Sequence, residues 1–236
     1  MTPISTKTRS KEAEIMDKFD FKGEELKKVL RTIDKINTKL GGHRVTIKGV
    51  QELLTQTPNK HFVIADLGCG SGDALRQISK WAKQHNINVQ LIGIDANPHT
   101  IEIAREWSRD YKNISYRVID VFSEDFDEFE ADIITCGLTL HHFEDDSINT
   151  LLPILLEKAK LGLVINDLQR SKLAYHLFKL YCKVFVNSDI ARTDGLISIL
   201  RGFQKKELED FGKQLNLNQH ITWYWAFRYQ WIIYSS

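Results

Sequence analysis

The residues best placed to do chemistry lie in a glycine-rich run from Asp66 to Asp73, directly after the apolar segment Phe62–Ala65. Glycines let a backbone turn tightly and approach a ligand, and the helix that follows offers free N–H groups. The spacing is G-x-G-x-G, whereas dinucleotide-binding loops have G-x-G-x-x-G. Asp66 is badly placed for an anionic pyrophosphate but suits an ammonium group. The loop therefore favours a nucleoside ligand that carries a cation.

Two more carboxylates follow the next apolar segments. Asp95 ends the second segment, where a side chain can accept hydrogen bonds from both hydroxyls of a ribose. Asn97, followed by Pro98, is the better cap for the next helix, which leaves Asp95 free for a ligand. Asp120 ends the third segment, where it can accept a hydrogen bond from the amine of adenine while Phe122 covers the ring.

His141 and His142 follow the apolar segment Ala131–Cys136, at the sheet edge where open α/β folds bind ligands. Imidazole titrates near neutral pH, so either ring is a candidate general base for a phenolic proton. The alternative is that this segment shapes the ligand pocket without touching the proton. Asp167, after the fifth apolar segment, is a further candidate base or a cap for the segment that follows it.

The composition limits the classes of partner. The 32 basic and 31 acidic residues leave a formal charge of +1, which argues against a large nucleic-acid footprint. No apolar stretch is long enough to span a membrane, and the N-terminus lacks the apolar region of a signal peptide. The three cysteines form no C-x-x-C pair and have no histidine at metal-ligand spacing. We expect a cytoplasmic protein, a monomer or homodimer, with free thiols and no metal.

The elements that position these residues alternate from His61 onward. Five buried strands are expected at Phe62–Ala65, Val89–Ile94, Ile114–Ile119, Ala131–Cys136 and Gly162–Ile165. Helical periods lie between them, so the strands form a parallel sheet covered on both faces through right-handed crossovers. Two more strands, Ile221–Ala226 and Tyr229–Tyr234, are joined so tightly that they must be antiparallel.

Helices are expected to flank this sheet. Apolar residues recur every three or four positions from Glu24 to Leu40, and Gly41-Gly42 ends that helix. A shorter helix covers Ile47–Leu54, whereas the first ten residues are expected to fray. We divide the chain into an N-terminal helical segment, 1–60, and a main domain, 61–236. Within it, residues 170–203 form a helical lid.

The run Asp66–Asp73, the segment Gly93–Asp95, the acidic end of the third strand and the run Thr135–Phe143 together resemble motifs of the class I methyltransferases. These enzymes use S-adenosylmethionine (SAM) and release S-adenosylhomocysteine (SAH). The resemblance covers roughly residues 60–170. It implies a Rossmann-like, doubly wound, seven-stranded α/β sheet of order 3-2-1-4-5-7-6 with the last strand antiparallel. It also implies cofactor contacts from Asp66, Gly68, Cys69, Gly70, Gly72, Asp95, Ala96, Asp120, Val121 and Cys136.

The acceptor side is less constrained. The Leu-His-His-Phe segment at 140–143 resembles small-molecule methylases of quinone and polyketide pathways, which implies a phenolic, quinol or polyketide-like acceptor in secondary metabolism. The pattern from Arg192 to Phe203 resembles a bacterial group associated with type III polyketide synthases, although Thr193 stands where that group has a histidine. Tyr175, Arg192 and Arg201 are the predicted substrate contacts.

Four rival functions can be compared with O-methylation of a small molecule. Methyl transfer to a ring carbon is indistinguishable from O-methylation at this level. An NAD(P)-dependent oxidoreductase is disfavoured by the loop spacing and by the lack of a Tyr-x-x-x-Lys motif. A non-catalytic SAM-binding module is disfavoured because every expected cofactor residue is present. Methylation of protein or nucleic acid is disfavoured because no Asn-Pro-Pro-Tyr motif and no basic surplus occur.

Overall fold

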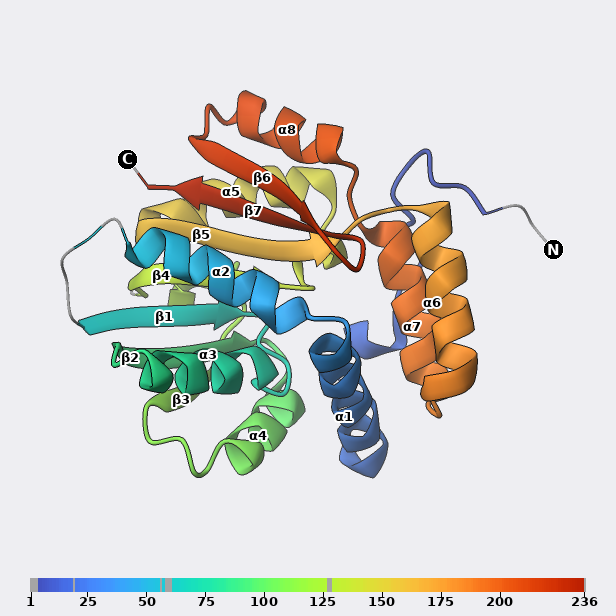
Figure 1. Cartoon of the computed structure of the whole chain (residues 1–236), viewed down its shortest axis with the longest axis horizontal. Helices are drawn as coiled ribbons and strands as arrows, with labels where there is room; N and C mark the ends of the chain where they lie inside the picture. Colours follow the sequence, from blue (N-terminus) through green and yellow to red (C-terminus); the bar gives the residue numbers. More distant parts are fainter. Residues whose placement is uncertain (1–3, 19, 56, 58–60, 127–128, 236) are drawn as a thin grey trace.

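The computed structural model describes residues 4–18, 20–55, 57, 61–126 and 129–235. Its centre is a seven-stranded sheet of order β3-β2-β1-β4-β5-β7-β6 (Figure 1). The first five strands are parallel, and β7 runs antiparallel to both of its neighbours. The predicted fold class, strand order and antiparallel last strand are confirmed. The strands are β1 (His61–Leu67), β2 (Asn88–Asp95), β3 (Ile114–Val118), β4 (Ala131–Gly137), β5 (Ala159–Leu168), β6 (Gln219–Tyr224) and β7 (Arg228–Tyr234).

Helices cover both faces of the sheet, and each face has its own apolar core. One core is formed with α5 and α8, and the other with α2, α3 and α4. Among the described residues, no helix is both long and apolar enough to cross a membrane. The helices are α1 (Gly23–Lys39), α2 (Gly42–Leu54), α3 (Asp73–Gln84), α4 (Pro98–Trp107), α5 (Asp145–Lys158), α6 (Lys172–Phe185), α7 (Asp189–Arg201) and α8 (Lys205–Gln214).

Local chemistry explains several of these boundaries. Asn97 caps α4 as predicted, because its side chain accepts a hydrogen bond from the N–H of His99 at 2.9 Å and Pro98 is the first helical residue. Gly41 adopts a left-handed φ of 74° between α1 and α2, which ends the first helix. The second helix begins at Gly42, five residues earlier than the predicted Ile47, and the side chain of Asn166 in β5 donates to the carbonyl of Gly42 at 2.9 Å.

The predicted lid is an antiparallel pair of helices, α6 and α7, at the edge of the molecule beside α1 (Figure 1). The N-terminal segment was expected to fray, and this prediction is wrong for Arg9 and Ser10. The N–H of Ser10 donates to the carbonyl of Leu200 at 2.9 Å. The guanidinium of Arg9 donates to the carbonyls of Arg201, His141 and Phe143, each at 2.8 Å. The polar residues Arg9 and Ser10 therefore contact the lid and the turn at His141–Phe143.

Candidate functional site

A cavity of about 860 Å³ lies where the carboxyl ends of the parallel strands face α1, the lid and the N-terminal segment. Ligands of open α/β sheets bind at this edge. Ten of the predicted site residues line the cavity: Asp66, Gly68, Cys69, Gly70, Asp95, Ala96, Asp120, Val121, His141 and His142. The structure therefore brings both predicted histidines and the glycine loop to one space.

The glycine loop follows β1 and leads into α3. Gly68, Gly70 and Gly72 have φ values of 63°, 51° and 74°, which favour glycine. A Cβ at Gly68 would collide with the side chain of Thr139, and one at Gly72 would collide with the hydroxyl of Tyr116. A Cβ at Gly70 would meet no atom within 4 Å, so the space beside this residue is open to a ligand.

The three predicted carboxylates differ in their surroundings. Asp66 is buried, accepts a hydrogen bond from the Thr135 hydroxyl at 2.6 Å, and has a pKa that burial raises to about 7. Asp95 accepts from the N–H of Gly70 at 3.1 Å and from the N–H of Asn97 at 2.9 Å, and burial raises its pKa. Asp120 is exposed, and its carboxylate accepts from the N–H of Phe122 at 3.0 Å.

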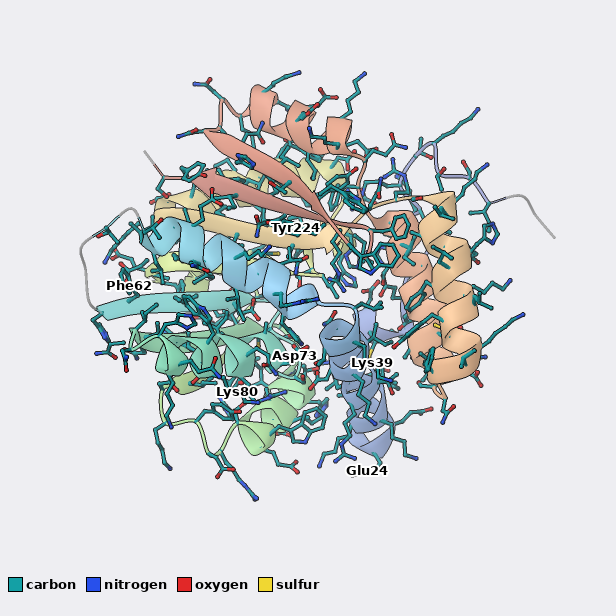
Figure 2. All side chains as sticks on the ribbon, viewed as in Figure 1. Glu24, Lys39, Phe62, Asp73, Lys80 and Tyr224 are labelled. Atoms are coloured by element: carbon teal, nitrogen blue, oxygen red, sulfur yellow. The ribbon has the colours of Figure 1, made fainter. Side chains whose placement is uncertain are left out.

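Helix α1 adds polar contacts to the glycine loop that the sequence did not indicate. The hydroxyl of Ser71 donates to Asp34 at 2.6 Å, and Arg76 donates to the same carboxylate at 3.0 Å. Burial raises the pKa of Asp34 to about 7, and the charge of Asp73 adds to the shift. Figure 2 shows Asp73 at the start of α3, where it faces α1. The apolar periodicity of α1 concealed this polar contact, because Asp34 reads as a solvated position.

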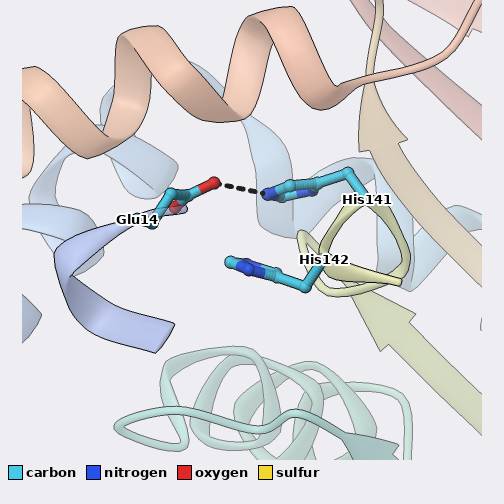
Figure 3. Close-up of side chains that lie close together, drawn as sticks. All are labelled: Glu14, His141 and His142. Atoms are coloured by element: carbon cyan, nitrogen blue, oxygen red, sulfur yellow. Dashed lines mark ion pairs between the residues drawn. The ribbon is translucent and has the colours of Figure 1, made fainter. Parts of the chain in front are cut away.

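His141 lies between two buried carboxylates. Its Nδ1 is 2.7 Å from Asp167 Oδ1, and its backbone N–H donates to the other oxygen of Asp167 at 3.1 Å. Its Nε2 faces Glu14 Oε1 at 3.5 Å, as Figure 3 shows. Burial opposes a charge on this ring, but Asp167 and Glu14 outweigh it and raise the pKa of His141 to about 9. The ring is therefore positively charged at neutral pH, with an N–H on each nitrogen.

His142 has one carboxylate partner and remains partly exposed. Its Nδ1 lies 2.6 Å from Asp17 Oδ1, and its side chain is 28% exposed. Asp17 also accepts from Arg201 at 2.7 Å. Burial would raise the pKa of Asp17, but hydrogen bonds from His142 and Arg201 outweigh it and hold the pKa well below its usual range. Asp17 thus fixes the ring of His142 at the cavity wall.

Besides Asp34, the sequence did not reveal two further cavity residues, Glu14 and Asp17. Both lie in or beside a short 3-10 turn, Ile15–Asp17, which belongs to no motif. Asp194 of α7 anchors this turn, because its carboxylate accepts from the N–H groups of Ile15 and Met16 at 2.9 and 3.0 Å. The one sequence feature that pointed to this turn was Asp194, which belongs to the pattern from Arg192 to Phe203.

Glu14, His141 and His142 offer metal-ligand atoms that all lie within 4.8 Å of one another (Figure 3). A dication would compete there with charge that is already present. Arg201 Nη1 is 3.8 Å from Glu14 Oε1, and the carboxylates beside His141 favour its protonated form. We expect this cluster to hold a proton rather than a metal ion, and this stays a prediction.

Six predicted site residues do not line the cavity: Gly72, Cys136, Asp167, Tyr175, Arg192 and Arg201. Cys136 is in the core, and Asp167 lies behind His141. Arg192 pairs with Asp189 at 3.1 Å on the surface. Arg201 is buried and donates to the carbonyls of His141 and His142 at 3.2 and 2.7 Å. Its position indicates a structural contact, so a direct role for Arg201 in substrate binding stays a prediction without support.

Residues 64–160 match a family model described as a methyltransferase domain. No curated protein sequence is significantly similar to the chain. Among solved structures, the plantazolicin methyltransferase BpumL, in complex with a pentazolic desmethylPZN analogue and SAH, is 18% identical. That match has a TM-score of 0.67 and covers 89% of this chain and 91% of that chain.

Two further solved structures share this architecture. Magnesium protoporphyrin IX methyltransferase from Synechocystis PCC 6803, with bound SAM, is 12% identical, with a TM-score of 0.56 and coverage of 86% of this chain and 84% of that chain. The CMeT domain of the citrinin polyketide synthase is also 12% identical, with a TM-score of 0.60, and the match covers 79% of this chain and 50% of that chain. At these identities the likeness establishes the fold.

Proposed function

We propose that this chain, whose residues 64–160 match a family model described as a methyltransferase domain, transfers the methyl group of SAM to an oxygen atom of a phenolic, quinol or polyketide-like small molecule. One observation carries the proposal. The glycine loop and the carboxylates Asp66, Asp95 and Asp120 line the same cavity as a histidine that is partly exposed. The proposed cofactor site and a candidate base therefore share one cavity.

The described residues fit SAM at the loop. The open space beside Gly70 accommodates a ligand close to the backbone, and Asp66 is near enough to attract an ammonium group. Asp95 is held by two backbone N–H groups, and its oxygens keep lone pairs for the hydroxyls of a ribose. Asp120 can accept from the adenine amine, and Phe122, which is 48% exposed and lines the cavity, can cover the ring.

When bound, SAM supplies an electrophilic methyl group on a sulfonium, and the leaving thioether is neutral. The protein must then orient the acceptor and take up the proton of its hydroxyl group. His142 is the candidate base, because it lines the cavity and Asp17 orients its ring. Such a base contributes about 10²–10⁴-fold to the rate.

His141 has a different role in this proposal. Its Nδ1 contacts Asp167 and its Nε2 faces Glu14, and these two carboxylates raise the pKa of the ring to about 9, so His141 is a poor base at neutral pH. The two rings lie 4.3 Å apart between centroids. Because Asp167 and Glu14 already compensate the charge of His141, we infer that His141 is a positioning residue, whereas His142 removes the proton.

A thermal-shift series with SAM, SAH and NAD tests the cofactor assignment. A ligand at 100 times its Kd adds about 2.7 kcal/mol to the free energy of unfolding. SAM and SAH should stabilise the protein and NAD should not. Stabilisation by NAD alone would contradict the proposal and favour the oxidoreductase.

A second assay identifies the reaction. The chain is incubated with SAM labelled in its methyl group and with phenols and quinols of increasing chain length, and the products are analysed by mass spectrometry and NMR. The label should appear as a methoxy group. A label on a ring carbon favours the C-methyltransferase, and SAM binding without any product favours the non-catalytic module. Cytoplasmic location, a role in secondary metabolism, the absence of a nucleic-acid partner and the monomeric or dimeric state stay predictions.

A further inference from the structure

An apolar stripe lies exposed along the outer side of α6. Its members are Leu173, Leu177, Leu180 and Val184, whose exposed fractions are 59%, 40%, 60% and 67%. The spacing i, i+4, i+7, i+11 places them in one row on a helix. Scattered exposed leucines are ordinary, but four in a continuous row indicate an interaction surface.

The stripe is not part of the core of the lid. The opposite side of α6 carries Ala174, Phe178 and Cys182, and the last two pack against α1 and α7 in a separate apolar cluster. Figure 1 shows α6 at the outer edge of the molecule. The packing of the lid is therefore complete without the stripe.

A row of basic residues runs beside the stripe, one position earlier along the helix. It consists of Lys172, His176, Lys179 and Lys183. No Asp or Glu occurs from residue 172 to residue 185. An apolar row flanked by a basic row is the pattern of a helix that lies in the interface of an anionic membrane.

The cavity reaches the surface beside the stripe. Leu177 is partly exposed and also lines the cavity, and so does Trp225 at the tip of the β6–β7 hairpin, which is 63% exposed. Phe178 and Tyr181 of the same helix also line the cavity. An apolar path thus leads from the outer side of α6 to the two histidines.

We propose that α6 binds an anionic lipid bilayer through this stripe and its basic row, lying in the plane of the interface. The α6 surface, Leu173, Leu177, Leu180 and Val184 with the four basic residues, then faces the acyl chains and the lipid phosphates. A lipophilic acceptor can enter the cavity beside Leu177 directly from the bilayer, a step that rests on the proposed function. Binding of the bilayer itself does not depend on it.

Charge decides between a bilayer and a second copy of the chain. Two copies that met through this face would bring two basic rows together, with no carboxylate on α6 to compensate them. Like charges in close contact are unfavourable. Lipid phosphates supply the opposite charge, whereas the partner helix does not.

The test is co-sedimentation of the full chain with sucrose-loaded vesicles. One set contains phosphatidylcholine alone, and the other contains phosphatidylcholine with about one third phosphatidylglycerol. We expect binding to the anionic set at least ten times tighter than to the neutral set, and weaker at high salt because the lysines are screened. No binding to the anionic vesicles, or equal binding to both sets, overturns the proposal.

Two pairs of substitutions refine the test. Leu180→Ser with Val184→Ser removes half of the stripe, and Lys179→Gln with Lys183→Gln removes half of the basic row. Each pair should weaken vesicle binding at least tenfold. The matched control is Val118→Ser with Lys112→Gln, on and beside β3, where Val118 is 44% exposed. It should change binding less than twofold, and an equal loss in the control overturns the assignment to α6.

Two further measurements separate the remaining outcomes. The SAH-induced thermal shift of each variant shows whether the fold and the cofactor site are intact, because none of the substituted residues lines the cavity. Light scattering without lipid shows whether the chain dimerises. A dimer that the stripe variants dissociate identifies a second copy as the occupant and overturns the bilayer. Vesicle binding without any methyl transfer rejects the proposed function while the bilayer proposal stands.

Discussion

The cofactor side and the acceptor side of the cavity are built in different ways. On the cofactor side, a carboxylate at a strand end accepts from backbone N–H groups of the adjoining loops, as Asp95 does from Gly70 and Asn97. On the acceptor side, they join segments far apart in the chain, such as His142 with Asp17 and Arg201. The first arrangement can be recognised as a motif. The second exists only once the chain has folded.

The same contrast extends to charge. Burial raises the pKa values of Asp66 and Asp95 on the cofactor side. On the acceptor side, partner charges outweigh burial, so Glu14 and Asp167 have lowered pKa values and that of His141 is raised. On the cofactor side, Asp66 and Asp95 have no cationic partner among the described residues and can bind a cationic ligand. On the acceptor side, the carboxylates are already paired with cationic side chains. Ligand binding and proton transfer should therefore be separable by mutation.

The largest effect is expected from His142→Gln. Loss of the base should lower kcat by about 10²–10⁴-fold, while the Kd for SAH stays within twofold. Steady-state kinetics and calorimetric titration measure the two quantities. Asp17→Asn is the matched variant, because it keeps the base and removes its orienting charge, and it should show a smaller loss in kcat. If His142→Gln weakens SAH binding as much as it lowers kcat, the division between the two sides is wrong.

His141 should make stability depend on pH. Its folded pKa of about 9 exceeds the unfolded value of about 6.5, so the protonated ring stabilises the fold fully below pH 6.5. This contribution, about 3 kcal/mol, is lost as the pH rises toward 9.

Urea unfolding at pH 6, 7.5 and 9 measures this loss. The wild type should lose stability relative to His141→Asn across the range, and His176→Asn, an exposed histidine on α6, is the control. If the free energy of unfolding depended on pH in the same way for the wild type and His141→Asn, the positive charge assigned to His141 would be contradicted.

On the cofactor side, Asp95→Asn should weaken SAH binding by about 10–100-fold, because hydrogen bonds to a charged group contribute about 1.5–3 kcal/mol. Asp120→Asn should weaken it less than tenfold, since Asp120 is exposed and water competes for its bonds. Calorimetric titration with SAH compares both variants. Neither substitution should alter how the free energy of unfolding depends on pH above pH 7. A change in that pH dependence would mean that the cofactor side and the acceptor side are coupled.

The smallest effect is expected from metal removal. The Glu14 cluster suits a proton, so treatment with EDTA should change the rate of methyl transfer less than twofold. The assay is repeated with added Mg²⁺ and Zn²⁺ after dialysis. A loss with EDTA that one of these ions restores would assign the cluster to a metal.

Much of the cofactor side could be predicted because its signals are local. A glycine loop after an apolar strand, and acidic residues at successive strand ends, are set by turn geometry and by the alternation of strands and helices. The strand order followed from the resemblance, and the antiparallel terminal pair followed from the short connection between Tyr224 and Arg228. Boundaries were less accurate, since β5 runs from Ala159 to Leu168 and is longer than the predicted Gly162–Ile165.

The sequence by itself determined the sheet, the glycine loop and the order of the carboxylates, because periodicity and turn chemistry act over a few residues. Only the tertiary structure decided that Glu14 and Asp17 face the two histidines, and that Arg201 serves the backbone of that pair rather than the cavity. These contacts span more than a hundred residues, or join the lid to a strand end. No local pattern encodes such partners, because burial and charge pair them only after the N-terminal segment and the lid close over the sheet.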